Sequence, residues 1–110
     1  MKMIIAIVQD KDSVKLLEEL MTKGYRATKL SSSGGFLRSG NTTLLIGVDE
    51  EKTNDVIEII KETCHSREQL VTPMSPVGTT GTESFLPFPV EVVVGGATIF
   101  VIDVEEFHKA

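Results

Sequence analysis

The sequence predicts an α+β domain in which two helices cover one face of an antiparallel sheet. Three observations predict it. Two segments repeat apolar residues at helical spacing, and several short runs rich in β-branched residues have the length of strands. The order of these segments, strand-helix-strand twice over, is the third. Because the chain has 110 residues, the size of one domain, we expect residues 1–110 to fold as a single unit.

The first half of the chain has the pattern of a strand, a helix and a second strand. MIIAIVQ at 3–9 is apolar and short, which favours a strand buried on both faces. Asp10 and Asp12 follow as candidate helix caps, and Gly24 is placed to end the helix in a left-handed conformation. The predicted core-facing side of this helix is Val14, Leu17, Leu20 and Met21. YRATKL at 25–30 alternates and predicts the second strand.

The second half begins with a predicted loop at 31–41 and a strand at 42–48. A helix is expected over 49–64, with acidic residues in its first turns, where the helix dipole favours them. Its predicted apolar face is Val56, Ile57, Ile60 and Cys64.

Residues 66–88 are rich in Pro, Gly and Thr and too long for an ordinary connection. We interpret them as a functional loop with a short strand, EQLV, near its start. Two β-branched runs follow, separated by Gly95 and Gly96, and two such residues predict a hairpin turn between adjacent strands.

This order of elements predicts a ferredoxin-like, split βαβ sandwich. The predicted strands are apolar almost throughout, whereas two helices can cover only one face of their sheet. An uncovered apolar face favours aggregation unless a partner hides it. We therefore expect a homo-oligomer whose subunits cover each other's sheets.

Composition argues against several classes of function. A net charge of −5 disfavours nonspecific nucleic-acid binding. No apolar run is long enough for a membrane span, and no signal peptide is visible, so we expect no membrane insertion and a cytoplasmic location. His65 and His108 lie in no metal-ligand spacing, and Cys64 sits on an apolar helical face. No residue pattern indicates catalysis, so the protein is predicted not to be an enzyme and to hold no metal.

The stretch SSSGGFLRSGN at 31–41 is a candidate ligand loop. Gly34 and Gly35 permit close backbone approach, so that successive N–H groups can face an anion. Phe36 offers a flat surface on which a base can stack, while Arg38 and Asn41 add a charge and an amide. The alternative is a flexible hairpin loop whose Phe lies in the core, and the pattern alone does not decide between the two.

Two further features point to the same region. On a strand at 25–30, Arg26 and Thr28 share one face, and both can hydrogen-bond one phosphate. The alternative is an ordinary edge strand with solvated charges. Gly47 interrupts an otherwise apolar strand, which often marks the close approach of a ligand or backbone. A β-bulge would explain it equally well.

Taken together, four blocks resemble the PII-like cyclic di-AMP receptors of Gram-positive bacteria. They are MKMIIAIVQD, YRATKLSSSGGFLRSGNTT, REQLVTP and FPVEVVVGGATIFV. The resemblance runs from Met1 to about His108. It implies the PII-like version of the ferredoxin-like fold, a homotrimer, cyclic di-AMP bound in clefts between neighbouring subunits, no enzymatic activity, no cofactor, and an unidentified downstream protein.

The resemblance also implies roles for particular residues. Arg26 and Thr28 would lie near the phosphates, and Phe36 would stack on an adenine. The backbone amides near the phosphates would be those of Gly35, Phe36 and Leu37. Asn41 and the backbone at Gly47 would recognise the buried base, and Phe100 would lie beside the site. The chain departs from some relatives at Gly24 and at His108-Lys109, where those relatives have Asn and Gln.

Other functions remain as alternatives. One is an adenylate sensor, for ATP or ADP, that regulates a transporter or enzyme. A small phosphodiesterase and a purely structural oligomer are the others.

Overall fold

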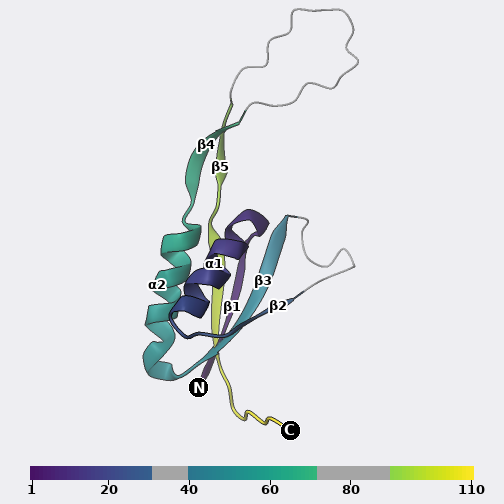
Figure 1. Cartoon of the computed structure of the whole chain (residues 1–110), viewed down its shortest axis with the longest axis vertical. Coiled ribbons are helices and arrows are strands. Elements are labelled where there is room, and N and C mark those ends of the chain that lie inside the picture. Colours follow the sequence, from purple (N-terminus) through teal and green to yellow (C-terminus); the bar gives the residue numbers. More distant parts are fainter. Residues whose placement is uncertain (31–39, 72–89) are drawn as a thin grey trace, which may run out of the picture.

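The computed structural model describes residues 1–30, 40–71 and 90–110, in one α+β fold (Figure 1). Its elements in chain order are β1 (Lys2–Gln9), α1 (Asp10–Thr22), β2 (Ala27–Leu30), β3 (Asn41–Val48), a 3-10 turn (Glu50–Lys52), α2 (Thr53–Cys64), β4 (Arg67–Val71), β5 (Val90–Val94) and β6 (Ala97–Asp103). The predicted strands and helices are all present. Of the two loops predicted at 31–41 and 66–88, residues 31–39 and 72–88 lie outside the described residues.

The main sheet has the strand order β2-β3-β1-β6, and every neighbouring pair is antiparallel. Both helices lie on the same face of this sheet (Figure 1). This arrangement confirms the ferredoxin-like sandwich. β4 and β5 form a separate two-stranded sheet that extends away from the sandwich, beyond the end where α1 begins. We call this two-stranded sheet, residues 67–71 and 90–94, the arm.

The core lies between the sheet and the two helices. Alternate residues of β1 and β3 point into it, because successive side chains on a strand face opposite sides. Its fully buried large side chains are Ile4, Val8, Leu16, Leu20, Leu44, Ile46, Val56, Ile60 and Cys64. The face predicted for the second helix is therefore largely correct, with Ile57 only partly buried.

The face predicted for α1 is partly wrong. Leu20 is buried, but Val14 and Met21 are 63% and 71% exposed. The helix is rotated so that Ser13, Leu16 and Leu20 point inward. Because Leu16 and Leu17 are adjacent in the sequence, the apolar pattern fits two rotations of the helix about its axis. Packing against the sheet selects the rotation that buries Leu16, while Leu17 is only partly buried.

The caps predicted for α1 are also wrong. Asp10 and Asp12 lie inside the first turn, and the N-cap position is Gln9, without a side-chain cap. Each carboxylate instead accepts a hydrogen bond from a distant residue, Asp10 from Thr42 and Asp12 from Arg67.

The hairpin turn predicted at Gly95 and Gly96 is wrong as well. β5 pairs with β4, and β6 pairs with β1, so the two strands flanking the glycines belong to different sheets. Both glycines have positive φ, +84° and +90°, and they form the junction between the arm and the main sheet. Local sequence predicts a change of direction here but cannot identify the strand with which each flank pairs.

The face of the main sheet opposite the helices has no cover within the described part of this chain. A row of paired residues crosses it, made by Thr28, Leu45, Ile5 and Phe100. Phe100 is 52% exposed, and Leu30 and Ile102 on the same face are also exposed. We call this apolar surface the open face.

Candidate functional site

The candidate site begins where α1 ends. Gly24 has φ +85°, as predicted for a residue that terminates a helix. The N–H of Gly24 donates to the carbonyl of Met21 at 3.0 Å, and that of Tyr25 donates to the carbonyl of Leu20 at 2.8 Å. These two bonds form a Schellman motif, which turns the chain sharply into β2.

The side chains of residues 25–28, which lead into β2, alternate between the two faces of the sheet. Tyr25 and Ala27 pack against the core, whereas Arg26 and Thr28 are exposed on the open face. The predicted alternation is therefore confirmed. β2 is also an edge strand of the sheet, so an exposed Arg26 alone would fit the simpler interpretation of a solvated charge.

Gly47 lies beside Arg26 across the ladder. Ala27 pairs with Ile46, and the same register continued by one residue sets Arg26 opposite Gly47. The pairing of Gly47 with Met3 on its other side is continuous, so the alternative of a β-bulge is wrong. A Cβ at Gly47 would come within 3.2 Å of the terminal methyl of the Met1 side chain, a tight contact that this flexible side chain could relieve by moving slightly.

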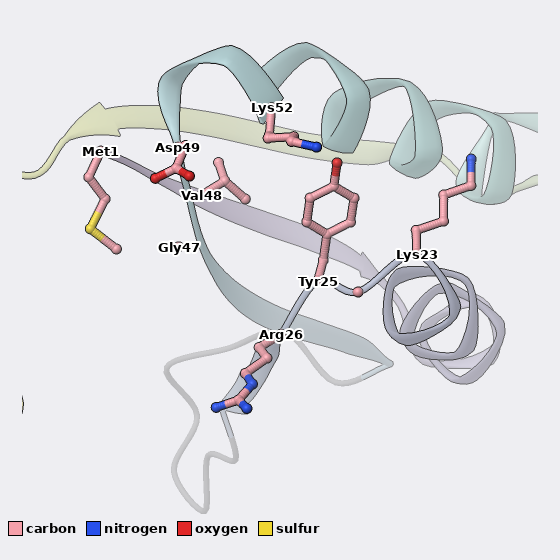
Figure 2. A pocket seen from close by; sticks show the side chains of 9 residues that line it. Met1, Lys23, Tyr25, Arg26, Gly47, Val48, Asp49 and Lys52 are labelled. Carbon is pink, nitrogen blue, oxygen red and sulfur yellow. The ribbon is translucent and has the colours of Figure 1, made fainter.

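Arg26 and Gly47 line one cleft (Figure 2). The full lining is Met1, Lys23, Gly24, Tyr25, Arg26, Gly47, Val48, Asp49 and Lys52. The cleft lies at the edge of the sheet, between the start of β2 and the turn that leads into α2. Two residues singled out from the sequence for separate reasons are therefore neighbours in space.

The charge of this cleft opposes that of the whole chain. Lys23, Arg26 and Lys52 are cationic, and Asp49 is the one acid among its lining residues, whereas the chain carries −5. A local cationic surface attracts small anions even when the net charge is negative. The cleft holds about 390 Å³ and is open to solvent, near the lower limit of typical ligand pockets.

One wall of the cleft is fixed by Tyr25. Its hydroxyl donates to the Asp55 carboxylate at 2.6 Å, which ties the start of β2 to α2. This hydrogen bond to Asp55 raises the pKa of the Tyr25 hydroxyl. The proton therefore stays on Tyr25 in the neutral range, and the aromatic ring is held as a wall of the cleft.

The other predicted site residues are not brought to this cleft within one chain. Asn41 begins β3, six residues before Gly47 and therefore roughly 20 Å away along the strand. It lines a different hollow, together with Gln9, Gly95 and Thr98. Phe100 is three strands from Thr28, roughly 14 Å across the sheet. The predicted residues Gly35, Phe36, Leu37 and Arg38 lie outside the described residues.

Sequence patterns did not single out Lys23, Tyr25, Asp49 or Lys52 as site residues. Lys52 ends the 3-10 turn before α2, 26 positions after Arg26, and its local sequence resembles any solvated helix start. Tyr25 alternates with Arg26 along the chain, so the pattern places the two side chains on opposite faces. The pairing of β3 with β2 brings the turn that follows β3 beside Arg26, and the hydrogen bond between Tyr25 and Asp55 brings α2 there as well.

Outside the cleft, the part of the chain that the structure describes contains no reactive thiol and no cluster of metal ligands. Cys64 is fully buried, and burial raises the pKa of its thiol to about 11, so it is protonated and unreactive at neutral pH. No group of three potential metal ligands occurs among residues 1–30, 40–71 and 90–110. Over the same residues, no helix has both the length and the hydropathy to cross a bilayer.

The fold and the cleft define a small ferredoxin-like domain with a cationic cleft at a sheet edge. The whole chain, residues 1–110, matches the sequence model of the Cyclic-di-AMP receptor family. It is also similar to the crystal structure of a functionally unknown protein from Pediococcus pentosaceus ATCC 25745. The identity is 45%, the TM-score is 0.77, and the match covers 99% of this chain and 96% of that one. The chain belongs to the cyclic-di-AMP receptor family.

Proposed function

We propose that this protein is a cytoplasmic, non-enzymatic receptor that binds cyclic di-AMP between the subunits of a homotrimer. The observation that carries the proposal is the convergence of Arg26 and Gly47 in one cationic cleft. Membership of the receptor family over residues 1–110 supports the identity of the ligand. A dianion with two flat purines matches a guanidinium, open backbone and aromatic surfaces.

The separation of the predicted residues supports a site shared between subunits. Arg26 and Thr28 lie at one edge of the sheet and Phe100 at the other. Both edges border the apolar open face, where Phe100 is half exposed. A neighbouring copy that covers this face would bring its own Phe100 toward Arg26. The small volume of the cleft in one chain is consistent with a ligand held by two.

In this proposal each residue has a physical role. The Arg26 guanidinium and the Thr28 hydroxyl bind phosphate oxygens, with the amides of Gly35, Phe36 and Leu37 beside them. Phe36 stacks on one adenine. Asn41 of one subunit and the Gly47 backbone of a neighbouring subunit bind the other adenine, since these two residues lie roughly 20 Å apart along β3 of one chain. Arg38 adds positive charge near the phosphates. Loops 31–41 and 66–88 then take one arrangement in preference to others, and a downstream protein recognises that arrangement.

Arg26→Ala tests the phosphate role. Loss of a charge-assisted hydrogen bond, about 1.5–3 kcal/mol, should weaken cyclic di-AMP binding roughly 10- to 150-fold in calorimetry. Lys29→Ala is the matched control, because Lys29 lies on the same strand, is exposed and does not line the cleft. Equal affinity of Arg26→Ala and the parent would remove Arg26 from the phosphate site.

A titration with cyclic di-AMP, cyclic di-GMP and ATP tests the choice of ligand. Tight binding of cyclic di-AMP alone is expected, whereas displacement by ATP at similar concentrations would favour an adenylate sensor. Recovery of intact cyclic di-AMP separates a receptor from a phosphodiesterase. The mass in solution should be about 36 kDa for three 12.0 kDa chains; a 12 kDa species would contradict a shared site.

A further inference from the structure

Residues 9–12, where β1 passes into α1, contact two separate regions of the molecule. We call these four residues the junction. On one side they contact residues 40–42, where the predicted ligand loop ends and β3 begins. On the other side they contact the base of the arm. Networks of hydrogen bonds and ion pairs of this kind are contacts through which two separate sites can be coupled.

The ligand-side contacts come from Gln9 and Asp10. The N–H of Asp10 donates to the Gly40 carbonyl at 2.8 Å. The Asp10 carboxylate accepts a hydrogen bond from the Thr42 hydroxyl. Gln9 pairs with Asn41 at the end of the β1-β3 ladder. The backbone that carries Asn41 is therefore fixed by the junction on both sides.

The arm-side contacts come from three of the same four residues. The Gln9 side-chain oxygen accepts a hydrogen bond from the N–H of Gly95 at 2.8 Å. Asp12, whose side chain is 8% exposed, binds Arg67 through both carboxylate oxygens, at 2.9 and 3.4 Å. The Lys11 ammonium donates to Gln69 at 3.0 Å. Arg67 also donates to the His65 carbonyl at 3.1 Å, which closes the attachment onto the end of α2.

These polar contacts hold the arm because apolar packing does not. Leu70, Val90, Val92 and Val93 of the arm are all exposed. A two-stranded sheet of this size is marginal when isolated. The orientation of the arm relative to the main sheet therefore depends on contacts at its base. Among the described residues, the junction supplies three of them, beside those that Arg67 and Gly96 make with the end of α2.

We propose that the junction couples cyclic di-AMP binding at Asn41 to the anchoring of the arm. This inference rests on the proposed function. A ligand that binds Asn41 favours the arrangement in which residues 40–42 hold Asp10 and Gln9 in place. The same arrangement presents Gln9 to Gly95 and Asp12 to Arg67, so the ligand stabilises the arm at its base. A downstream partner that contacts the arm would then distinguish liganded from free protein.

Hydrogen exchange measured peptide by peptide tests this coupling. In the parent protein, saturating cyclic di-AMP should slow exchange in two regions, residues 41–48 and the arm. For the arm we expect about a tenfold change, within the ~5- to 150-fold range of typical coupling between sites. In Gln9→Ala and in Arg67→Gln, ligand should still protect 41–48, while protection of the arm falls to less than about twofold.

Lys2→Gln is the matched control, because it removes an ion pair, with Asp103, at the opposite end of β1. It should behave as the parent does. Gln9→Ala removes one side-chain acceptor and no charge, so it serves if Arg67→Gln fails to fold. Ligand protection of the arm that persists in both folded variants would overturn the coupling, as would a parent arm that shows no protection. Absence of binding heat in the parent would instead refute the proposed function, and the coupling with it.

Discussion

The sandwich and the arm are built from similar residues but are stabilised in opposite ways. β1 and β5 are both rich in β-branched side chains, yet Ile4, Ala6 and Val8 are essentially fully buried, while Val93 is 68% exposed. The sandwich is held by apolar burial, which is strong and tolerant of small changes in geometry. The arm is held by hydrogen bonds and an ion pair at its base, which require particular atoms in particular places.

Because of this difference, we expect the sandwich to resist rearrangement and the arm to change its conformation at a lower free-energy cost. Segments with little apolar contact open at a lower free-energy cost than the core. A ligand of ordinary affinity can therefore bias the arm, whereas it could not rearrange the sheet. The division suits the proposed function, in which the ligand binds on the rigid sandwich and a downstream protein recognises the arm.

The largest expected effect comes from the core of the sandwich. Leu20→Ala removes a fully buried side chain between α1 and the sheet. It should lower the free energy of unfolding by about 2–5 kcal/mol in urea denaturation. Val93→Ala, the same kind of truncation in the arm, should cost about 0.5 kcal/mol or less. A similar cost for the two variants would show that the arm is buried in the native assembly.

A smaller and more local effect is expected at the base of the arm. Alanine at Gly95 must adopt φ +84°, and its Cβ would clash with both Arg67 Nη1 and the His65 carbonyl oxygen. Gly96→Ala is the matched control, because Gly96 also has positive φ, +90°, but open space around it. The control should cost about 1–2 kcal/mol from backbone strain alone.

Gly95→Ala should cost more than Gly96→Ala and should speed hydrogen exchange in the arm more than in β1 or β3. Thermal unfolding combined with hydrogen exchange measures both quantities. Equal effects of the two substitutions would indicate that the Arg67 attachment does not constrain the arm.

The smallest effect is the pH dependence from Cys64. Burial raises the pKa of this thiol from 9.0 to about 11, so the folded state keeps a proton that the unfolded state releases first. Stability is therefore unaffected by this group below pH 9 and falls as pH rises from 9 toward 11. The slope of unfolding free energy against pH in that window should be steeper for the parent than for Cys64→Ala. Identical slopes would mean that the thiol is not desolvated.

Much of the fold could be predicted because it depends on local patterns. The strand at 3–9, the helix end at Gly24 and the short strand near residue 68 all follow from periodicity or from glycine conformation, and the structure contains each of them. The alternation that exposes Arg26 and Thr28 follows from the geometry of any strand. These features need no knowledge of distant residues.

The errors arise where distant residues decide. Gly95 and Gly96 were expected to join two paired strands, but β4 and β1 compete for the flanking segments and separate them. Asp10 and Asp12 were expected to cap α1, but Thr42 and Arg67 take their carboxylates. The cleft shows the same limit, since Lys52 comes near Arg26 through the pairing of β3 with β2, which no local pattern around either residue predicts.

The order and type of the elements, the two faces of β2 and the family can all be predicted from the amino-acid sequence, because each is encoded in neighbouring residues or in a long pattern of identities. Three features required the folded chain: the rotation of α1, the separation of the arm from the main sheet and the lining of the cationic cleft. Each of these three features depends on which residue, among several of similar chemistry, comes within contact distance of another. That choice is made when the whole core packs, so no single stretch of sequence contains it.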